Sequence, residues 1–223
     1  MSVAETIHRI NQELLPAATR LVAVSKFHPK EAILEAYEAG QRIFGESRVQ
    51  ELCEKQSACP NDIEWHFIGH LQTNKIKQIT PFVSLIHGVD SLKLLREINK
   101  EGEKIGRVIP CLLQIHIATE ESKFGFSFEE CDEVVSGDVL KELRYISLRG
   151  LMGMATLTEN PDQIRSEFRS LKNYFDKLKK GYFKDTPAFC EISMGMSDDY
   201  KIALEEGSTM VRIGSAIFGS RVY

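Results

Sequence analysis

Short runs of apolar and β-branched residues recur along the chain, and stretches with the three-to-four-residue spacing of amphipathic helices separate them. Eight such runs predict strands, at residues 21–26, 42–47, 64–69, 83–89, 110–117, 147–154, 188–195 and 210–215. Strands that alternate with helices are typical of βα units, which build a parallel sheet.

The intervening stretches carry helix start and stop signals of their own. Pro29 suits a first helical turn and Gly40 the stop that follows it. Ser127 with Glu130 has the spacing of a capping box, and Asn160 opens a long amphipathic stretch. The alternation therefore does not depend on strand propensity alone.

Eight βα units preceded by one extra N-terminal helix predict an α/β protein, a (β/α)8 TIM barrel. No Gly-, Ser- or Pro-rich linker interrupts the chain, so we expect one domain over residues 1–223. The alternative is an open doubly wound sheet. It is disfavoured because Lys26-Phe27-His28-Pro29 follows the first predicted strand, where a dinucleotide-binding fold has its GxGxxG turn.

Composition narrows the function classes. Hydrophobic residues make up 43% of the chain and charged residues 27%, and no apolar run is long enough to cross a bilayer, which predicts a protein outside the membrane. A net charge of −4 gives no broad cationic field for nucleic acid. Five cysteines without CxxC spacing are expected to be reduced thiols, so the predicted location is the cytoplasm.

Lys26 ends the first predicted strand, at the rim where barrel enzymes carry their reactive groups. Strand alternation places it on the same face as Val22 and Val24. An amine between Val24 and Phe27 can be partly desolvated, which lowers its pKa and favours attack on a carbonyl. The alternative is a lysine whose stem packs while its ammonium group reaches water.

Small residues follow the last two predicted strands, where TIM barrels often bind phosphate. Segment 193–197, Ser-Met-Gly-Met-Ser, ends the seventh strand, and Gly214 and Ser215 follow the eighth. Together they predict an anion site made of hydroxyls and backbone N–H groups. Asp198 and Asp199 would repel a phosphate, so we expect both to face solvent.

Arg212 lies in an otherwise apolar strand, where a buried guanidinium needs acceptors. Glu46, Glu191 and a bound ligand are equally reasonable partners at this point. His66 and His70 are four residues apart in a strand and loop rather than on a helix, so structural roles are expected and no metal site is predicted.

Taken together, these motifs resemble the pyridoxal phosphate homeostasis protein family. They occur in the family's order over nearly the whole chain: AVSK at 23–26, FGESRVQE at 44–51, WHFIGHLQTNK at 65–75, GLM at 150–152, SMGMSDD at 193–199 and RIGSAIFG at 212–219. The family is similar in fold to the barrel domain of alanine racemase and lacks that enzyme's second, β-rich domain.

The resemblance implies a set of cofactor-binding residues. Lys26 would hold pyridoxal 5'-phosphate (PLP) as a Schiff base, and Ser193, Gly214 and Ser215 would hold the phosphate. Arg212 would meet the pyridine nitrogen, which disfavours its protonation and weakens the cofactor as an electron sink.

Two further positions carry weaker assignments. Ser47 stands where the family commonly has asparagine, so its hydroxyl would reach the cofactor through water. Met152, in the GLM motif, would line the site.

The implied function is carrying and buffering of PLP in a monomer, with apo PLP enzymes as partners and with no turnover and no catalytic residues of its own. A low-activity PLP-dependent racemase or lyase is the alternative from the enzyme class, weakened by the absence of an obvious second acid/base residue. A cofactor-free aldolase that uses Lys26 on a sugar phosphate is a third reading.

Overall fold

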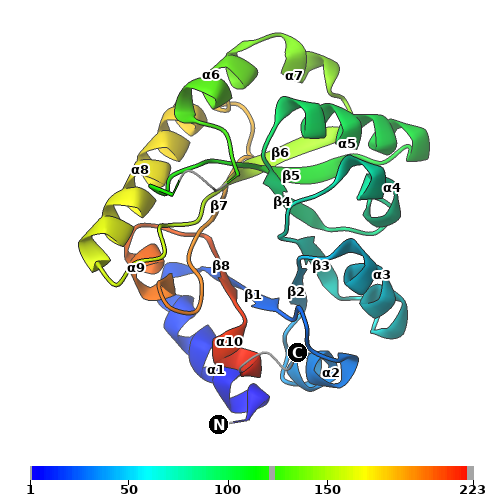
Figure 1. Ribbon diagram of the computed structural model, residues 1–223, viewed down its shortest axis with the longest axis vertical. Coiled ribbons are helices and arrows are strands. Elements are labelled where there is room, and N and C mark those ends of the chain that lie inside the picture. The colour runs from blue at the N-terminus through cyan, green and yellow to red at the C-terminus, as the bar shows by residue number, and fades with distance from the viewer. Residues whose placement is uncertain (1, 121–123, 220–223) are drawn as a thin grey trace.

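All eight predicted strands form in the computed structural model, which describes residues 2–120 and 124–219, and they pair in chain order into a closed parallel barrel (Figure 1). They are β1 (Arg20–Val24), β2 (Ile43–Glu46), β3 (Glu64–Phe67), β4 (Leu85–Val89), β5 (Ile109–Gln114), β6 (Ile146–Met152), β7 (Glu191–Ser193) and β8 (Met210–Ile213). β1 pairs with both β2 and β8, which closes the ring and contradicts the open-sheet alternative. Residues 1, 121–123 and 220–223 of the predicted domain lie outside the described residues.

Helices surround the ring of strands (Figure 1). They are α1 (Val3–Leu14), α2 (Lys30–Glu38), α3 (Val49–Ala58), α4 (Ile76–Ile79), α5 (Leu92–Ile105), α6 (Phe128–Ser136), α7 (Val139–Glu142), α8 (Pro161–Lys180), α9 (Tyr200–Glu205) and α10 (Ser215–Phe218), with short 3-10 turns η1 (Leu15–Ala17) and η2 (Thr73–Lys75). The extra helix α1 packs against α2 and α10. Because α2 follows the first strand and α10 follows the last, α1 lies beside the place where the barrel closes. The predicted N-terminal helix is therefore part of the barrel.

The predicted caps are present where the sequence signals them. Ser127 and Glu130 form both hydrogen bonds of the capping box that starts α6. Asn160 caps α8 by accepting the N–H groups of residues 162 and 163. Gly40 follows α2 with a φ of +95°, a conformation that a β-carbon disfavours, so glycine suits that stop.

Two hydrophobic layers hold the barrel. The larger lies between strands and helices, and the smaller lies inside the ring, where it includes Val22, Leu85, Leu112, Met152 and Met210. These five come from five different strands, as expected when alternate residues of each strand face the barrel interior. The interior is therefore packed at mid-height, and cavities lie above and below this layer, at the two ends of the barrel.

Several strands are shorter than predicted. β1 ends at Val24 rather than at Lys26, and β7 covers only Glu191–Ser193 within the predicted 188–195. Beyond these ends the chain leaves the regular strand conformation and turns over the rim. Lys26 is therefore a turn residue, two positions beyond the end of its strand.

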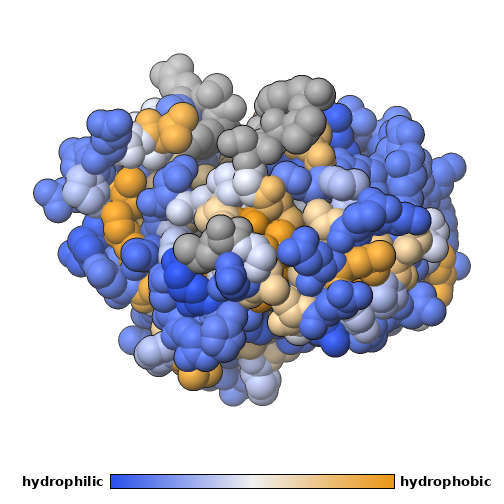
Figure 2. Space-filling view, turned by 90° about the horizontal axis from the view of Figure 1, so that it is seen from below, coloured by the Kyte–Doolittle hydropathy of each residue, from blue (hydrophilic) through white to orange (hydrophobic). Residues whose placement is uncertain are grey.

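The surface and the cysteines agree with a fold that needs no disulfide bonds. Hydrophilic residues predominate on the face seen in Figure 2, and hydrophobic ones occur there in small groups. All five cysteines are free, as predicted. Among the described residues, no helix combines the length and the apolar character needed to cross a membrane.

Candidate functional site

A cavity of about 280 Å³ opens at the carboxyl ends of the strands. Four predicted site residues line it: Lys26 after β1, Arg212 on β8, and Gly214 and Ser215 at the start of α10. These residues are far apart in the sequence, and closure of the ring between β1 and β8 brings them together. A cavity of this size, near the lower end of the usual range, suits one small molecule.

The first predicted element of the site is Lys26, and its face is as expected. Val22 packs inside the barrel, whereas Val24 and Lys26 line the cavity above it. Residues at even positions thus follow one line from the barrel interior to the rim. Lys26 is partly exposed and lines the cavity.

Next to Lys26, two turns with small residues, one after β7 and one after the neighbouring strand β8, form the predicted anion site. Ser197 lines the cavity together with Gly214 and Ser215, and its hydroxyl accepts the Gly214 N–H at 3.4 Å. A β-carbon at Gly214 would stand 3.0 Å from the carbonyl oxygen of Val24, so glycine lets the β8 turn approach the end of β1. The first N–H groups of a helix have no carbonyl partner within it, and those of α10 begin at this turn.

Arg212 forms neither of the ion pairs that the sequence left open. It donates to the carbonyl oxygen of Ser193 at 2.8 Å, to the Ser193 hydroxyl at 2.6 Å and to the Gly153 carbonyl at 3.1 Å. Glu46 pairs with Lys55, and Glu191 with Arg20. Burial lowers the pKa of Arg212 to about 10, a shift that the carboxylate of Asp199 opposes, so the guanidinium stays charged at neutral pH.

A chain of buried hydrogen bonds runs from Arg212 down through the barrel. The Ser193 hydroxyl lies 2.9 Å from Nδ1 of His87, whose Nε2 lies 3.0 Å from Nδ1 of His66. Because a guanidinium only donates, the Ser193 oxygen accepts from it, and the histidine tautomers set the direction of the two bonds below.

Burial keeps both histidines of this chain neutral. It lowers the pKa of His66 to about 3 and that of His87 well below the ordinary value. His66 also borders a second cavity of about 240 Å³ at the opposite, amino end of the strands, beside Arg20 and Glu191. The chain therefore spans the barrel interior, from Arg212 to His66.

Three predicted contacts do not reach the cavity lining. Ser193 is fully buried and its hydroxyl is engaged by Arg212 and His87. Met152 packs in the barrel interior beneath the cavity. Ser47 is partly buried, with its backbone tight against Gly69, where an added β-carbon would stand 2.3 Å from the Ser47 carbonyl oxygen.

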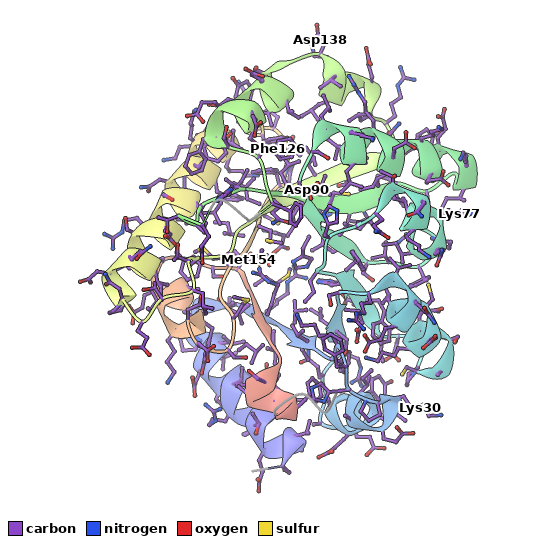
Figure 3. The ribbon with its side chains drawn as sticks, viewed as in Figure 1. Lys30, Lys77, Asp90, Phe126, Asp138 and Met154 are labelled. Atoms are coloured by element: carbon purple, nitrogen blue, oxygen red, sulfur yellow. The ribbon has the colours of Figure 1, made fainter. Side chains whose placement is uncertain are left out.

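Residues two or four positions further along the chain line the cavity instead. Met154 lies toward the centre of the ring in Figure 3 and takes the place expected for Met152. Ser197 takes the place expected for Ser193. His28 and Met196 also line the cavity, and sequence reasoning missed both. The alternation of residues along a strand could have identified Met154, because residues 152 and 154 lie on the same face.

The two aspartates after Ser197 behave differently from each other. Asp198 is exposed, as predicted, and lines the cavity. Asp199 is buried, so the expectation that it faces solvent is wrong. Its Oδ1 accepts the backbone N–H of Met196 at 2.5 Å, which holds the turn before α9. Burial raises the pKa of Asp199, although that hydrogen bond and Arg212 act against the shift.

Known proteins resemble this chain over its whole length. The family of the alanine racemase N-terminal domain matches residues 2–222. The pyridoxal phosphate homeostasis protein of Aquifex aeolicus is 38% identical over 100% of both chains. Its namesake in Schizosaccharomyces pombe is 39% identical over 90% of this chain and 84% of the relative, and that of Escherichia coli K12 is 37% identical over 99% and 97%.

Solved structures are also similar to this chain over nearly its whole length. PipY of Synechococcus elongatus PCC7942 without PLP superposes with a TM-score of 0.89 at 34% identity and covers 98% of this chain and 100% of PipY. The PLP-bound form of PipY gives 0.85 with the same identity and coverage. Alanine racemase of Bartonella henselae, 16% identical, has a TM-score of 0.74 and shares the fold over 98% of this chain and 58% of its own.

Proposed function

Since the chain belongs to the pyridoxal phosphate homeostasis protein family, we propose that it binds PLP and acts in PLP homeostasis, with Lys26 holding the cofactor as a Schiff base. The observation that carries the proposal is the shared cavity of Lys26, Arg212, Gly214 and Ser215. An amine and small-residue turns that line one cavity match a molecule with an aldehyde and a phosphate. When bound, PLP supplies an aldehyde carbon that amines attack.

The residues of the cavity divide the proposed binding between them. Ser197, Gly214 and Ser215 offer a hydroxyl pair and backbone N–H groups for the phosphate. Arg212 offers a charged donor for the pyridine nitrogen. Ser193 acts one step away, because its carbonyl and hydroxyl oxygens hold the guanidinium in place.

The wider role that we propose is a monomeric cytoplasmic carrier that buffers PLP and delivers it to apo PLP enzymes without turnover of its own. The family name of the relatives supports homeostasis rather than a metabolic reaction. Five free cysteines support a reducing compartment. A donor such as Arg212 at the ring nitrogen supports restraint of carbanion chemistry, because that nitrogen then stays unprotonated.

The test compares the purified protein with Lys26→Ala. The wild type is expected to be yellow and to retain PLP on Lys26 after borohydride reduction, as peptide mass mapping detects. Lys26→Ala is expected to lose the visible band and the adduct. Lys30→Ala is the matched control, since Lys30 is exposed and points away from the ring in Figure 3. Unchanged spectrum and affinity in Lys26→Ala would reject the assignment.

A low-activity racemase or lyase is a second candidate, and one observation favours it. His28 and Asp198 are titratable side chains that line the cavity, so acid/base groups are available there. Incubation of single amino acids with the holoprotein in deuterated water tests this reading. Exchange at Cα above that of free PLP, reduced in His28→Ala or Asp198→Asn, would establish an enzyme.

A further inference from the structure

The turn that carries Lys26 has a strained backbone. Phe27 follows Lys26 with a φ of +68°, in the left-handed region that residues other than glycine avoid. Placing an L-residue there costs roughly 1–2 kcal/mol. Contacts around the turn must therefore hold it.

Lys55 on α3 supplies such contacts. Its side chain is buried, and its ammonium nitrogen donates to the carbonyl oxygen of Ser25 at 2.7 Å, to Oε1 of Glu46 at 2.7 Å and to Oε1 of Glu51 at 2.6 Å. An ammonium group has three protons, so three acceptors use all of them. One of these acceptors is the backbone of the residue just before Lys26.

Both carboxylates return to the same turn. Oε1 of Glu46 accepts the Ser25 hydroxyl at 2.6 Å, and Oε1 of Glu51 accepts the Phe27 backbone N–H at 2.6 Å. Lys55 therefore reaches the residue before Lys26 directly and through Glu46, and the residue after it through Glu51. We call Lys55, Glu46, Glu51 and Ser25 the lysine clamp.

Burying the charged groups of the lysine clamp is unfavourable for the stability of the fold. Glu46 is fully buried, and within the described residues its Oε2 accepts no hydrogen bond. Burial raises the pKa of Glu46 to about 7 even though Lys55 and Ser25 act to lower it. Buried ion pairs commonly contribute less to stability than apolar residues of the same size. A role in geometry accounts for the clamp better than a role in stability.

We propose that Lys55 is a positioning residue for Lys26: its ammonium group fixes the strained turn so that the Lys26 amine faces the cavity ready to react. Lys55 does not itself line that cavity; it borders a separate outer groove. The proposal rests on the proposed function. In the step it serves, the Lys26 nitrogen forms a C=N bond to the aldehyde carbon, the C=O bond breaks, and the oxygen leaves as water with both amine protons.

The test separates reaction at Lys26 from occupancy of the cavity. Pyridoxine 5'-phosphate has an alcohol in place of the aldehyde, so it occupies the same space without condensing with an amine. In Lys55→Met, covalent capture of PLP on Lys26 is expected to slow at least about tenfold, because a misplaced reacting group loses its near-attack geometry. Affinity for pyridoxine 5'-phosphate is expected to stay within about twofold, as the phosphate side and Arg212 are unchanged.

Two further variants keep the test decisive. Lys177→Met is the matched control. Lys177 is an exposed lysine that pairs with Asp132 at 2.6 Å, and it does not line the cavity. Glu51→Gln covers the case in which Lys55→Met fails to fold. It keeps an oxygen for the Phe27 N–H and weakens the ammonium contact, so a smaller but selective slowing is expected.

The outcomes are distinct. Equal loss of both ligands in Lys55→Met, or in Glu51→Gln if the former does not fold, would mean a general structural role and would overturn the proposal. Unchanged capture rates would also overturn it, and so would mapping of the wild-type adduct to Lys55. Failure of the wild type to form any adduct on Lys26 would instead reject the proposed function.

Discussion

Two buried polar networks support the cavity, and one is made of charged groups whereas the other is made of neutral ones. The lysine clamp joins an ammonium group to two carboxylates and holds backbone atoms on either side of Lys26. The chain of Ser193, His87 and His66, here called the histidine chain, is uncharged and holds a side chain, that of Arg212. The lysine that we propose to react is thus positioned through its backbone, whereas the arginine is held at its guanidinium.

The networks also differ in location. The histidine chain crosses the barrel interior, and each of its three residues is at most 2% exposed. The clamp lies between β1, β2 and α3, with Glu51 partly exposed at its edge. Removing a link should therefore cost more stability in the histidine chain than in the clamp, where solvent can reach part of the damage.

The largest effect is expected from His87→Phe. The substitution leaves Nδ1 of His66 without its partner and the Ser193 hydroxyl with Arg212 alone, and a lost partner in the interior costs about 1–3 kcal/mol. The free energy of unfolding is expected to fall by about 3 kcal/mol in urea denaturation. His70→Phe, at an exposed histidine, is the control. A loss no larger than that of the control would mean that the histidine chain does not contribute to the free energy of unfolding.

The second prediction uses pH, because the networks respond with opposite signs. Folded His66 and His87 resist protonation, whereas the unfolded histidines take up protons below about 6.5, so the free energy of unfolding falls as the pH falls. Folded Glu46, with a pKa of about 7, binds a proton more readily than its unfolded form, so over the same range it adds stability.

Glu46→Gln isolates the contribution of the clamp. Without the opposing carboxyl, stability should fall more steeply between pH 6.5 and 4.5, by up to about 1.4 kcal/mol per pH unit relative to the wild type. Urea denaturation across that range measures the slope. Parallel slopes in the two proteins would mean that Glu46 does not hold a proton in the folded state.

Arg212→Met gives the third and smaller effect. Loss of the donor to the pyridine nitrogen is expected to weaken PLP binding about tenfold, or ~1.4 kcal/mol. Pyridoxine 5'-phosphate has the same ring nitrogen, so its affinity should fall equally. This is the reverse of Lys55→Met, in which only the aldehyde-bearing ligand suffers. Titration of each variant with both ligands makes the comparison, and selective loss of PLP in Arg212→Met would contradict the division of roles.

The fold was predictable because each strand is a short β-branched run between helix signals, and eight parallel strands have few ways to bury both faces. The ends of the strands were not. The two residues after Val24 carry no turn signal such as glycine or proline, so Lys26 was placed on its strand rather than in the turn after it. The face of the strand was nevertheless right, since alternation depends on backbone geometry alone.

The depth of each site residue was the harder problem. Ser193 and Ser197, like Met152 and Met154, belong to one motif each, and sequence places both members of a pair near the rim. Only the stagger of the closed barrel decides which one reaches the cavity. Lys55 was missed for another reason: four residues after Glu51, it has the pattern of an ordinary surface pair on a helix, and only burial distinguishes the two.

The smallest predicted effect concerns the strain that the clamp holds. Phe27→Gly and Phe27→Ala remove the same ring contacts, including the stacking of Arg48 on it, and differ only in the β-carbon. At a φ of +68° that carbon is the source of the strain, so the glycine variant is expected to be more stable by about 1 kcal/mol. At ordinary positions glycine is the less stable of the two. The same pair at Phe128, a residue of α6, should show that normal order in thermal and urea denaturation. If alanine were the more stable residue at both positions, the turn after Lys26 would be relaxed, and the clamp would have no strain to hold.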